Sequence, residues 1–188
     1  SLHDALPICI ANGFPLSVIT GKTEFMKIFD ELWVSSTNNS ETLSLAAGVS
    51  TINEINEKKT IPYCWNLGEK LFNGWNKSAE KYGLNSKMIG YPVRMFMKCY
   101  DSKNNESISL KSLILQELIK KGIFMSAGPS FISYSHNQND ISFTLNALDD
   151  IFKKITSIVT NDNYTDFLEG NVPKTIWTMA MSPVTKRN

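Results

Sequence analysis

The sequence predicts an α/β fold, and two patterns support this prediction. Strand and helix patterns alternate between residues 93 and 160, the order expected of a compact α/β layer. Apolar residues also recur at helical spacing over several long segments. Of the 188 residues, 42% are hydrophobic, so the chain has enough apolar material for a packed core.

The first expected elements are short. Residues 14–20 are apolar and β-branched and end at Gly21, which predicts a buried strand. Residues 23–29 predict a short helix that begins near Thr23. The polar run 35–40 cannot build a core, but its side chains can hydrogen-bond nearby backbone or a ligand.

A long helical pattern begins at Glu41, with Ser40 as its expected N-cap. Its apolar positions are Leu43, Ala46, Ala47, Val49 and Ile52. Pro62 either starts a new helix or kinks the first one. The apolar face then continues towards Gly83 through Trp65, Leu67, Leu71, Phe72 and Trp75.

The second half carries the α/β layer itself. Residues 90–92 indicate a turn, and a strand is expected over 93–100, with Arg94 and Lys98 on one face and Met95, Met97 and Cys99 on the other. A solvated loop, 101–106, follows. The next helix has its apolar stripe at Leu110, Leu113, Ile114, Leu118 and Ile119, and ends at Gly122.

Residues 123–125 predict a short strand before the last long helix. Asn137 or Asn139 is expected to cap that helix. Its apolar stripe consists of Ile141, Leu145, Leu148, Ile151, Phe152, Ile155 and Val159. In the tail, Pro173 and Pro183 argue against long regular elements, and Trp177 is expected to pack on something.

Composition narrows the classes of partner. The formal net charge is +1, from 19 basic and 18 acidic residues, so no electrostatic footprint for nucleic acid or anionic lipid is present. No stretch approaches the ~20 apolar residues of a membrane span. Cys9, Cys64 and Cys99 lack metal-ligand spacing and indicate reduced thiols of a cytoplasmic protein.

A family resemblance begins near the N-terminus. Ile10-Ala11-Asn12-Gly13-Phe14-Pro15 resembles the stretch that follows the Schiff-base lysine of class-III pyridoxal-phosphate (PLP) aminotransferases. Aligned in this way, Ile8 occupies the lysine slot, so no catalytic residue is assigned. Residues 1–8 lack a Met start and resemble translated sequencing-adapter DNA, so His3 and Asp4 are expected to carry no chemistry. A natural paralogue without the lysine is the alternative.

A second block, Ser35-Ser36-Thr37-Asn38-Asn39-Ser40-Glu41-Thr42-Leu43-Ser44-Leu45-Ala46-Ala47, resembles the family's Ser-Ser-Thr-Phe-Gly-Gly-Glu-Thr-Leu-Ser-Leu-Ala-Ala. The resemblance implies that Thr37 binds the cofactor phosphate across a homodimer interface. The alternative is that Thr37 only caps a turn. Further similarity over residues 116–124 and 135–141 supports the fold more than the chemistry.

The resemblance implies the C-terminal part of a fold-type I PLP-dependent transferase. Its expected parts are an artefact at 1–8, the end of the large PLP-binding domain at 9–50, linking helices at 51–87, a small C-terminal α/β domain at 88–162 and a tail at 163–188. The branch looks closest to glutamate-1-semialdehyde aminomutase, which implies small-molecule amino and carbonyl substrates. The isolated chain is expected to be inactive. A non-catalytic binding or regulatory module is the alternative.

Other candidate residues have simpler interpretations. His136 precedes a helix, which favours a capping or packing role over acid–base chemistry. Arg94 is expected on a solvated strand face, with a substrate carboxylate as the alternative ligand. The pairs Asp149/Asp150 and Glu54/Glu57 are interpreted as solvated helix faces. Gly21-Lys22-Thr23 is not the end of a phosphate-binding loop, because Leu16 stands where that loop requires glycine.

Overall fold

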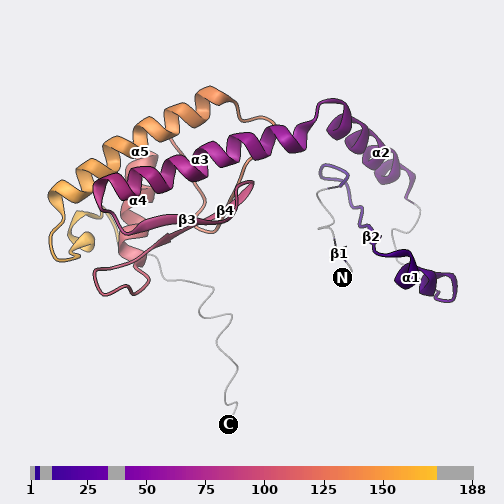
Figure 1. The fold of residues 1–188 in the computed structure, drawn as a ribbon, viewed down its shortest axis with the longest axis horizontal. Coiled ribbons are helices and arrows are strands. Elements are labelled where there is room, and N and C mark those ends of the chain that lie inside the picture. The colour runs from indigo at the N-terminus through magenta and orange to yellow at the C-terminus, as the bar shows by residue number, and fades with distance from the viewer. Residues whose placement is uncertain (1–2, 5–9, 34–40, 173–188) are drawn as a thin grey trace, which may run out of the picture. The chain divides into compact units, whose positions relative to one another are not determined.

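The computed structural model describes residues 3–4, 10–33 and 41–172 (Figure 1). Ile8, Thr37, Ser40 and Trp177 lie outside the described residues. The chain forms two compact units, Ser1–Pro62 and Tyr63–Asn188. Among the helices of the described residues, none is long and apolar enough to cross a bilayer.

The first unit contains little regular structure before its one long helix. Strand β1 (His3–Asp4) pairs antiparallel with β2 (Ile19–Thr20). Helix α1 (Thr23–Met26) continues into a 3-10 turn, η1 (Lys27–Asp30). The prediction of a buried strand over 14–20 is wrong, because only Ile19 and Thr20 are in a strand and both are exposed. A two-residue ribbon is too short to present a face that other elements can cover.

Helix α2 (Thr42–Glu57) forms where the sequence predicts it, but its apolar stripe is not buried among the described residues. The buried positions are Ser44 and Gly48 instead. A Cβ atom at residue 48 would lie 2.6 Å from Cδ2 of Leu16, so the small residues of α2 allow the preceding segment to approach closely. The large apolar side chains left exposed are Leu43, Leu45, Val49 and Ile52.

The first element of the second unit is helix α3 (Thr60–Tyr82), whose residues 60–62 are counted with the first unit. Pro62 lies in its first turn, where the missing N–H needs no partner, so this proline starts a helix and does not kink one. The predicted apolar face is confirmed at Leu67, Leu71 and Trp75, which are all buried. The helix ends at Gly83, whose φ of +66° lies in the left-handed region that glycine adopts without strain.

Three antiparallel strands form the sheet, in the order β3-β4-β5. Strand β4 (Arg94–Cys99) confirms the predicted alternation, with Met95, Met97 and Cys99 buried. Strand β3 (Ser86–Tyr91) was not predicted, because Gly90 and Pro92 suggested only a turn. Strand β5 lies at Pro129–Phe131 and not at the predicted 123–125. Ile123 and Met125 pack against the margin of the core while Phe124 is 88% exposed, so this segment contributes apolar contacts without pairing as a strand.

Two further helices complete this unit. Helix α4 (Ile108–Lys120) is capped by Ser107, whose side chain accepts a hydrogen bond from the N–H of Leu110. Helix α5 (Gln138–Ile158) begins with a capping box between Asn137 and Asp140, which decides the predicted choice in favour of Asn137. A 3-10 turn, η2 (Tyr164–Phe167), follows α5.

Helix α4 ends at the glycine that the sequence predicts. Gly122 has a φ of +79°, and its N–H donates to the carbonyl of Ile119, while the N–H of Ile123 donates to the carbonyl of Leu118. This pair of bonds is the Schellman arrangement. Ile119 itself is 58% exposed, so its predicted place in the buried stripe is wrong.

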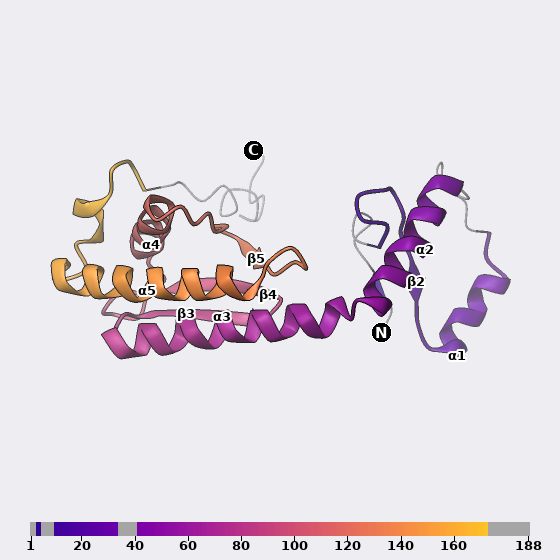
Figure 2. The ribbon, with the colours of Figure 1, turned by 90° about the horizontal axis from the view of Figure 1, so that it is seen from above.

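The core of the second unit lies between the three long helices and one face of the sheet (Figures 1 and 2). It contains Trp75 from α3, Met95 from β4, Leu113 from α4 and Phe152 from α5, all nearly or fully buried. Apart from Ala11, the buried apolar residues of the described chain all belong to this unit. The second unit therefore carries most of the apolar burial that the structure describes.

The approach of α3 to the β3–β4 turn depends on a glycine. A Cβ atom at residue 68 would overlap the carbonyl oxygen of Pro92 and lie 2.7 Å from its carbon, and backbone cannot easily move aside. We expect Gly68→Ala to destabilise the protein by roughly 1–3 kcal/mol through overpacking. Urea denaturation at neutral pH measures this change.

Gly74→Ala is the matched control in the same helix. Its Cβ would overlap only the terminal carbons of the Leu145 side chain, which can rotate away. Both substitutions bring the same gain in helix propensity. Equal stability of the two variants would show that the contact of Gly68 with Pro92 does not limit the packing.

Candidate functional site

The two residues aligned with the cofactor site of the family, Ile8 in the lysine slot and Thr37 at the phosphate, lie outside the described residues. Their geometry is therefore built only from the segments beside them. These segments are the turn that begins at Ile10 and the start of helix α2.

The turn after the lysine slot is formed by two residues with positive φ. Asn12 has a φ of 49° and Gly13 a φ of 104°, and the N–H of Phe14 donates to the carbonyl of Ala11 at 3.3 Å. Asn and Gly are the residues that tolerate this conformation most readily. Ala11 is 1% exposed, so the turn is anchored by a buried methyl group.

The N-cap of α2 is Glu41, so the prediction of Ser40 at this position is wrong. The side chain of Glu41 accepts hydrogen bonds from the N–H groups of Leu43 at 2.9 Å and Ser44 at 2.6 Å. Hydrogen bonds from Ser44 and then Leu43 lower the pKa of Glu41. This carboxylate therefore occupies the first free N–H groups of the helix.

One hydroxyl near this helix start is buried. The Oγ of Ser44 has no partner in full hydrogen-bond geometry among the described residues, but it lies close enough to the Glu41 carboxylate to lower the pKa of that group. A buried polar group needs a partner, and the Glu41 carboxylate is the acceptor within its reach.

His136 has a structural role. Its Nδ1 accepts a hydrogen bond from the N–H of Ser133 at 3.0 Å and lies 3.0 Å from that residue's Oγ. Its carbonyl accepts a hydrogen bond from the hydroxyl of Tyr63 at 2.9 Å. The ring thus closes the turn before α5, a structural role within the expected choice of capping or packing, while Asn137 and not His136 caps the helix.

Arg94 lies on the exposed outer face of β4, as the alternation predicted. Its guanidinium stands 5.0 Å from the ring centre of Phe96 and 5.9 Å from that of Phe131. These are cation–π distances. Its alternative role as a ligand of a substrate carboxylate stays a prediction.

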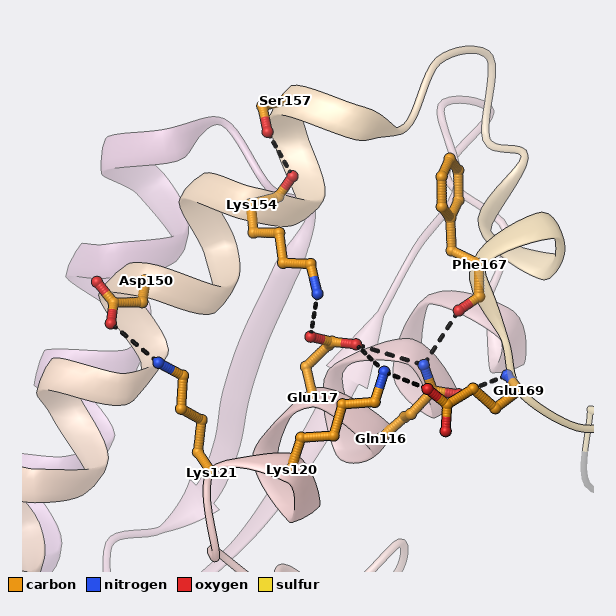
Figure 3. Close-up of polar contacts among 9 residues, drawn as sticks. All are labelled: Gln116, Glu117, Lys120, Lys121, Asp150, Lys154, Ser157, Phe167 and Glu169. Carbon is orange, nitrogen blue, oxygen red and sulfur yellow. Dashed lines mark hydrogen bonds and ion pairs between the residues drawn. The ribbon is translucent and has the colours of Figure 1, made fainter.

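The sequence did not single out Glu117, which is the centre of a polar network on α4 (Figure 3). Its carboxylate accepts hydrogen bonds from Lys154 at 2.5 Å, Lys120 at 2.9 Å and Gln116 at 3.4 Å. The only available signal was a carboxylate three residues after Ile114 and next to Leu118, at a position that the helical period places in the core.

The same network holds the segment that follows η2 (Figure 3). Gln116 donates to the carbonyl of Phe167 at 3.0 Å and accepts from the N–H of Glu169 at 2.8 Å. Lys120 also pairs with the carboxylate of Glu169 at 2.7 Å. The partners of Glu117 are therefore all engaged within the fold, which makes the network a structural one.

The carboxylate of Asp149 forms several hydrogen bonds with α3. The interpretation of this residue as part of a solvated helix face is therefore wrong. Its carboxylate accepts hydrogen bonds from Ser78, Lys81 and Tyr82 of α3, at 2.6 to 2.9 Å. The hydrogen bonds from Lys81 and Tyr82 lower the pKa of Asp149. Asp150 is exposed and pairs with Lys121 at 3.3 Å.

The chain has the fold of part of a fold-type I PLP-dependent transferase. The chain superimposes on the β-phenylalanine aminotransferase of Variovorax paradoxus with a TM-score of 0.68 and 20% identity, over 81% of this chain and 38% of that one. It superimposes on a transaminase with PLP bound with a TM-score of 0.64 and 18% identity, over 79% and 37%. The fold class expected from the sequence is therefore confirmed.

Among curated proteins, the chain is similar to glutamate-1-semialdehyde 2,1-aminomutase from Methanococcus maripaludis strain C5. The identity is 26% over 162 residues, which cover 78% of this chain and 37% of the aminomutase. No family model matches the chain. The chain spans about 37% of the length of these curated relatives, and the resemblance to the C-terminal part of such enzymes is confirmed.

The Glu117 network makes stability depend on pH. Burial raises the pKa of Glu117, but the hydrogen bonds from Lys154, Lys120 and Gln116 outweigh it and lower the pKa to about 2, from an ordinary 4.5. A carboxyl whose folded pKa is depressed stabilises the fold above its ordinary pKa, and this contribution is lost as the pH falls towards 2. We expect Glu117→Gln to cost about 1–3 kcal/mol at pH 7.

Urea denaturation of the parent chain and of Glu117→Gln, at several pH values between 7 and 2, measures this effect. The difference in unfolding free energy should shrink below pH 4.5. Glu54→Gln is the matched control, since Glu54 forms an exposed ion pair with Lys58 on α2 and should contribute at most ~0.5 kcal/mol. A pH-independent difference would show that packing, and not charge, explains the cost at Glu117.

Proposed function

We propose that this chain is the C-terminal portion of a PLP-dependent class-III aminotransferase or aminomutase, an enzyme that moves an amino group between an amino compound and a carbonyl compound. The observation that supports this most is the similarity to the aminomutase over 78% of the chain. The transaminase fold and the PLP bound to one of the similar structures agree with it.

The residues of this chain do not by themselves fit the cofactor. A PLP enzyme needs a lysine, an acid at the pyridine nitrogen, a surface against the ring and donors around the phosphate. In the aligned positions the lysine slot holds Ile8, and only Thr37 is aligned with a phosphate donor. The Glu41 carboxylate at the start of α2 would repel a phosphate placed on that helix terminus. The remaining groups must come from sequence that this chain does not span, so we infer that the isolated chain is inactive.

The proposed organisation follows the family resemblance. Residues 9–50 end the large domain, 51–87 link it to the small domain at 88–162, and 163–188 form a tail, while residues 1–8 are an artefact. The proposed enzyme is a cytoplasmic homodimer that takes small-molecule substrates and binds neither nucleic acid nor membrane. The alternative is a non-catalytic module of the same fold. Resequencing the DNA through codons 1–8 and upstream of them distinguishes the two, because an open frame that encodes the cofactor half and a lysine at position 8 would establish the enzyme.

The isolated chain should form no specific covalent adduct with PLP, because the alkyl side chain of Ile8 has no amine to condense with an aldehyde. Incubation with PLP, desalting, borohydride reduction and peptide mass spectrometry test this. The chain unfolded in urea measures background labelling of its lysines. Stoichiometric labelling of one lysine in the folded chain alone would contradict the proposal.

The proposed role of Thr37 can be tested in the complete enzyme, once resequencing has recovered its open reading frame. If its hydroxyl donates to the cofactor phosphate, Thr37→Val removes one bond to a charged group, worth roughly 1.5–3 kcal/mol. Affinity for PLP should therefore fall by about one to two decades. Thr37→Ser, which keeps the hydroxyl, should retain most of the affinity. Unchanged binding by Thr37→Val would make Thr37 a turn residue, and equilibrium dialysis of PLP measures each case.

A further inference from the structure

The chain continues beyond α5 and turns back towards α4. Helix α5 ends at Ile158, and Asn161 and Asp162 then have φ angles of 53° and 60°. Two consecutive residues in this left-handed region reverse the chain sharply, and Asn and Asp are among the residues other than glycine that tolerate it best. The turn η2 then packs against α4 (Figure 2). Residues 160–171 are called the strap below.

One end of the strap is anchored by a buried tyrosine and an aspartate. Tyr164 is 8% exposed and belongs to the core of the second unit. Burial, and then a hydrogen bond with Asp162, raise the pKa of the Tyr164 hydroxyl to about 12. The Asp162 carboxylate also accepts a hydrogen bond from the N–H of Ser102, in the loop after β4, at 2.9 Å. This end of the strap is therefore joined both to the core and to that loop.

The other end of the strap is held by one glutamine of α4 (Figure 3). The side-chain amide of Gln116 donates to the carbonyl of Phe167 at 3.0 Å and accepts from the N–H of Glu169 at 2.8 Å. Phe167 and Leu168 pack against the margin of the core. The ion pair of Glu169 with Lys120 adds little, because the Glu169 side chain is 72% exposed.

The strap is also bonded within itself. The side chain of Asn163 accepts a hydrogen bond from the N–H of Thr160 at 3.0 Å and donates to the carboxylate of Asp166 at 3.1 Å. The N–H of Asp166 in turn donates to the carbonyl of Asn163 at 3.2 Å. Bonds between near neighbours in the chain can persist when a segment leaves the core, because both partners move together. They favour motion of the strap as one unit.

The strap buries far less than the helix before it. Tyr164 is its one buried residue, and no strap residue takes part in a strand pair. Helix α5, by contrast, buries Leu148, Ile151 and Phe152 almost completely. Segments with few buried apolar contacts open at a lower free energy than the whole domain unfolds. Local opening is therefore expected at the strap before it is expected at α5.

We propose that the strap is a two-state lock on α4, which opens as one unit while the core of the second unit stays folded. The amide of Gln116 that donates to Phe167 also lies 3.4 Å from the Glu117 carboxylate. Lys120 likewise bonds both Glu117 and Glu169. Closure of the strap thus fixes two of the side chains that hold Glu117, and opening frees them.

The lock is a property of the second unit alone, because every contact that holds the strap is made within that unit. The blocks of sequence that resemble the transaminase family end at residue 141, before the strap begins. The proposal is therefore independent of the proposed enzymatic function.

Hydrogen exchange of the full 188-residue chain, followed by mass spectrometry, tests the proposal. We expect the protected amides of the strap to exchange together, and faster than those on the buried faces of α3 and α5. Gln116→Ala removes the hydrogen bonds to Phe167 and Glu169, so it should speed exchange throughout the strap about tenfold. Exchange in α3 should not change.

Gln138→Ala is the matched control. Gln138 is an exposed glutamine at the start of α5, and its side chain accepts a hydrogen bond from Lys70 and not from the strap. Both substitutions replace a helical glutamine by alanine, so their effects on helix propensity are alike. Gln138→Ala should change exchange of the strap by less than about twofold.

Four outcomes would overturn the proposal. Exchange of the strap only through global unfolding, with the same urea dependence as α5, would show that no local opening occurs. Faster exchange of residues 165–171 alone in Gln116→Ala would show that the strap does not move as a unit. Unchanged exchange in that variant would show that Gln116 does not hold the strap. Strap amides that lack protection in the parent chain would show that the lock is not closed in solution.

Discussion

The second unit depends on the burial of one indole ring. Trp75 of α3 is fully buried, and its ring meets that of Phe152 in α5 edge-on, with ring centres 5.3 Å apart. Its Nε1 donates to the Oγ of Ser86 in β3 at 3.1 Å. Because a buried indole N–H needs an acceptor, this bond sets where β3 lies against α3. One side chain therefore connects two helices and the edge of the sheet.

The residue after this tryptophan protects the edge strand. The amide of Asn76 accepts from the N–H of Met88 at 2.8 Å and donates to its carbonyl at 3.3 Å. These bonds satisfy the backbone of one residue of the edge strand, and so reduce the tendency of β3 to pair with another chain at that point.

The two units differ in how they use apolar side chains. In the second unit the helical stripes face a shared core, whereas α2 in the first unit keeps its large apolar residues exposed and buries Ser44 and Gly48. The chain spans about 37% of the length of its curated relatives. Under the proposed function, the remaining sequence supplies the partners of these residues and the cofactor groups that this chain lacks.

Much of the secondary structure could be predicted because its causes are local. Helices α4 and α5 follow from apolar periodicity, and their ends follow from Asn137 and Gly122, which act through their own backbone neighbours. The resemblance to the transaminase family also came from residue order alone. For the site, the sequence indicated only which residues align with the family's cofactor-binding positions. The roles of Ile8 and Thr37 stay predictions, because both residues lie outside the described part of the chain.

By itself the sequence determined the helices, the inward face of β4 and the class of fold, since these depend on residues close together along the chain. Tertiary structure decided which strands pair, so β3 and β5 were missed or misplaced: a short strand is stable only through a neighbour distant in sequence. It also decided the role of Glu117, whose partner Lys154 is 37 residues away. Likewise, the helical period of α2 predicted where its apolar stripe lies. Whether that stripe is buried depends on the elements that pack against it, and the spacing of residues within the helix does not encode those elements.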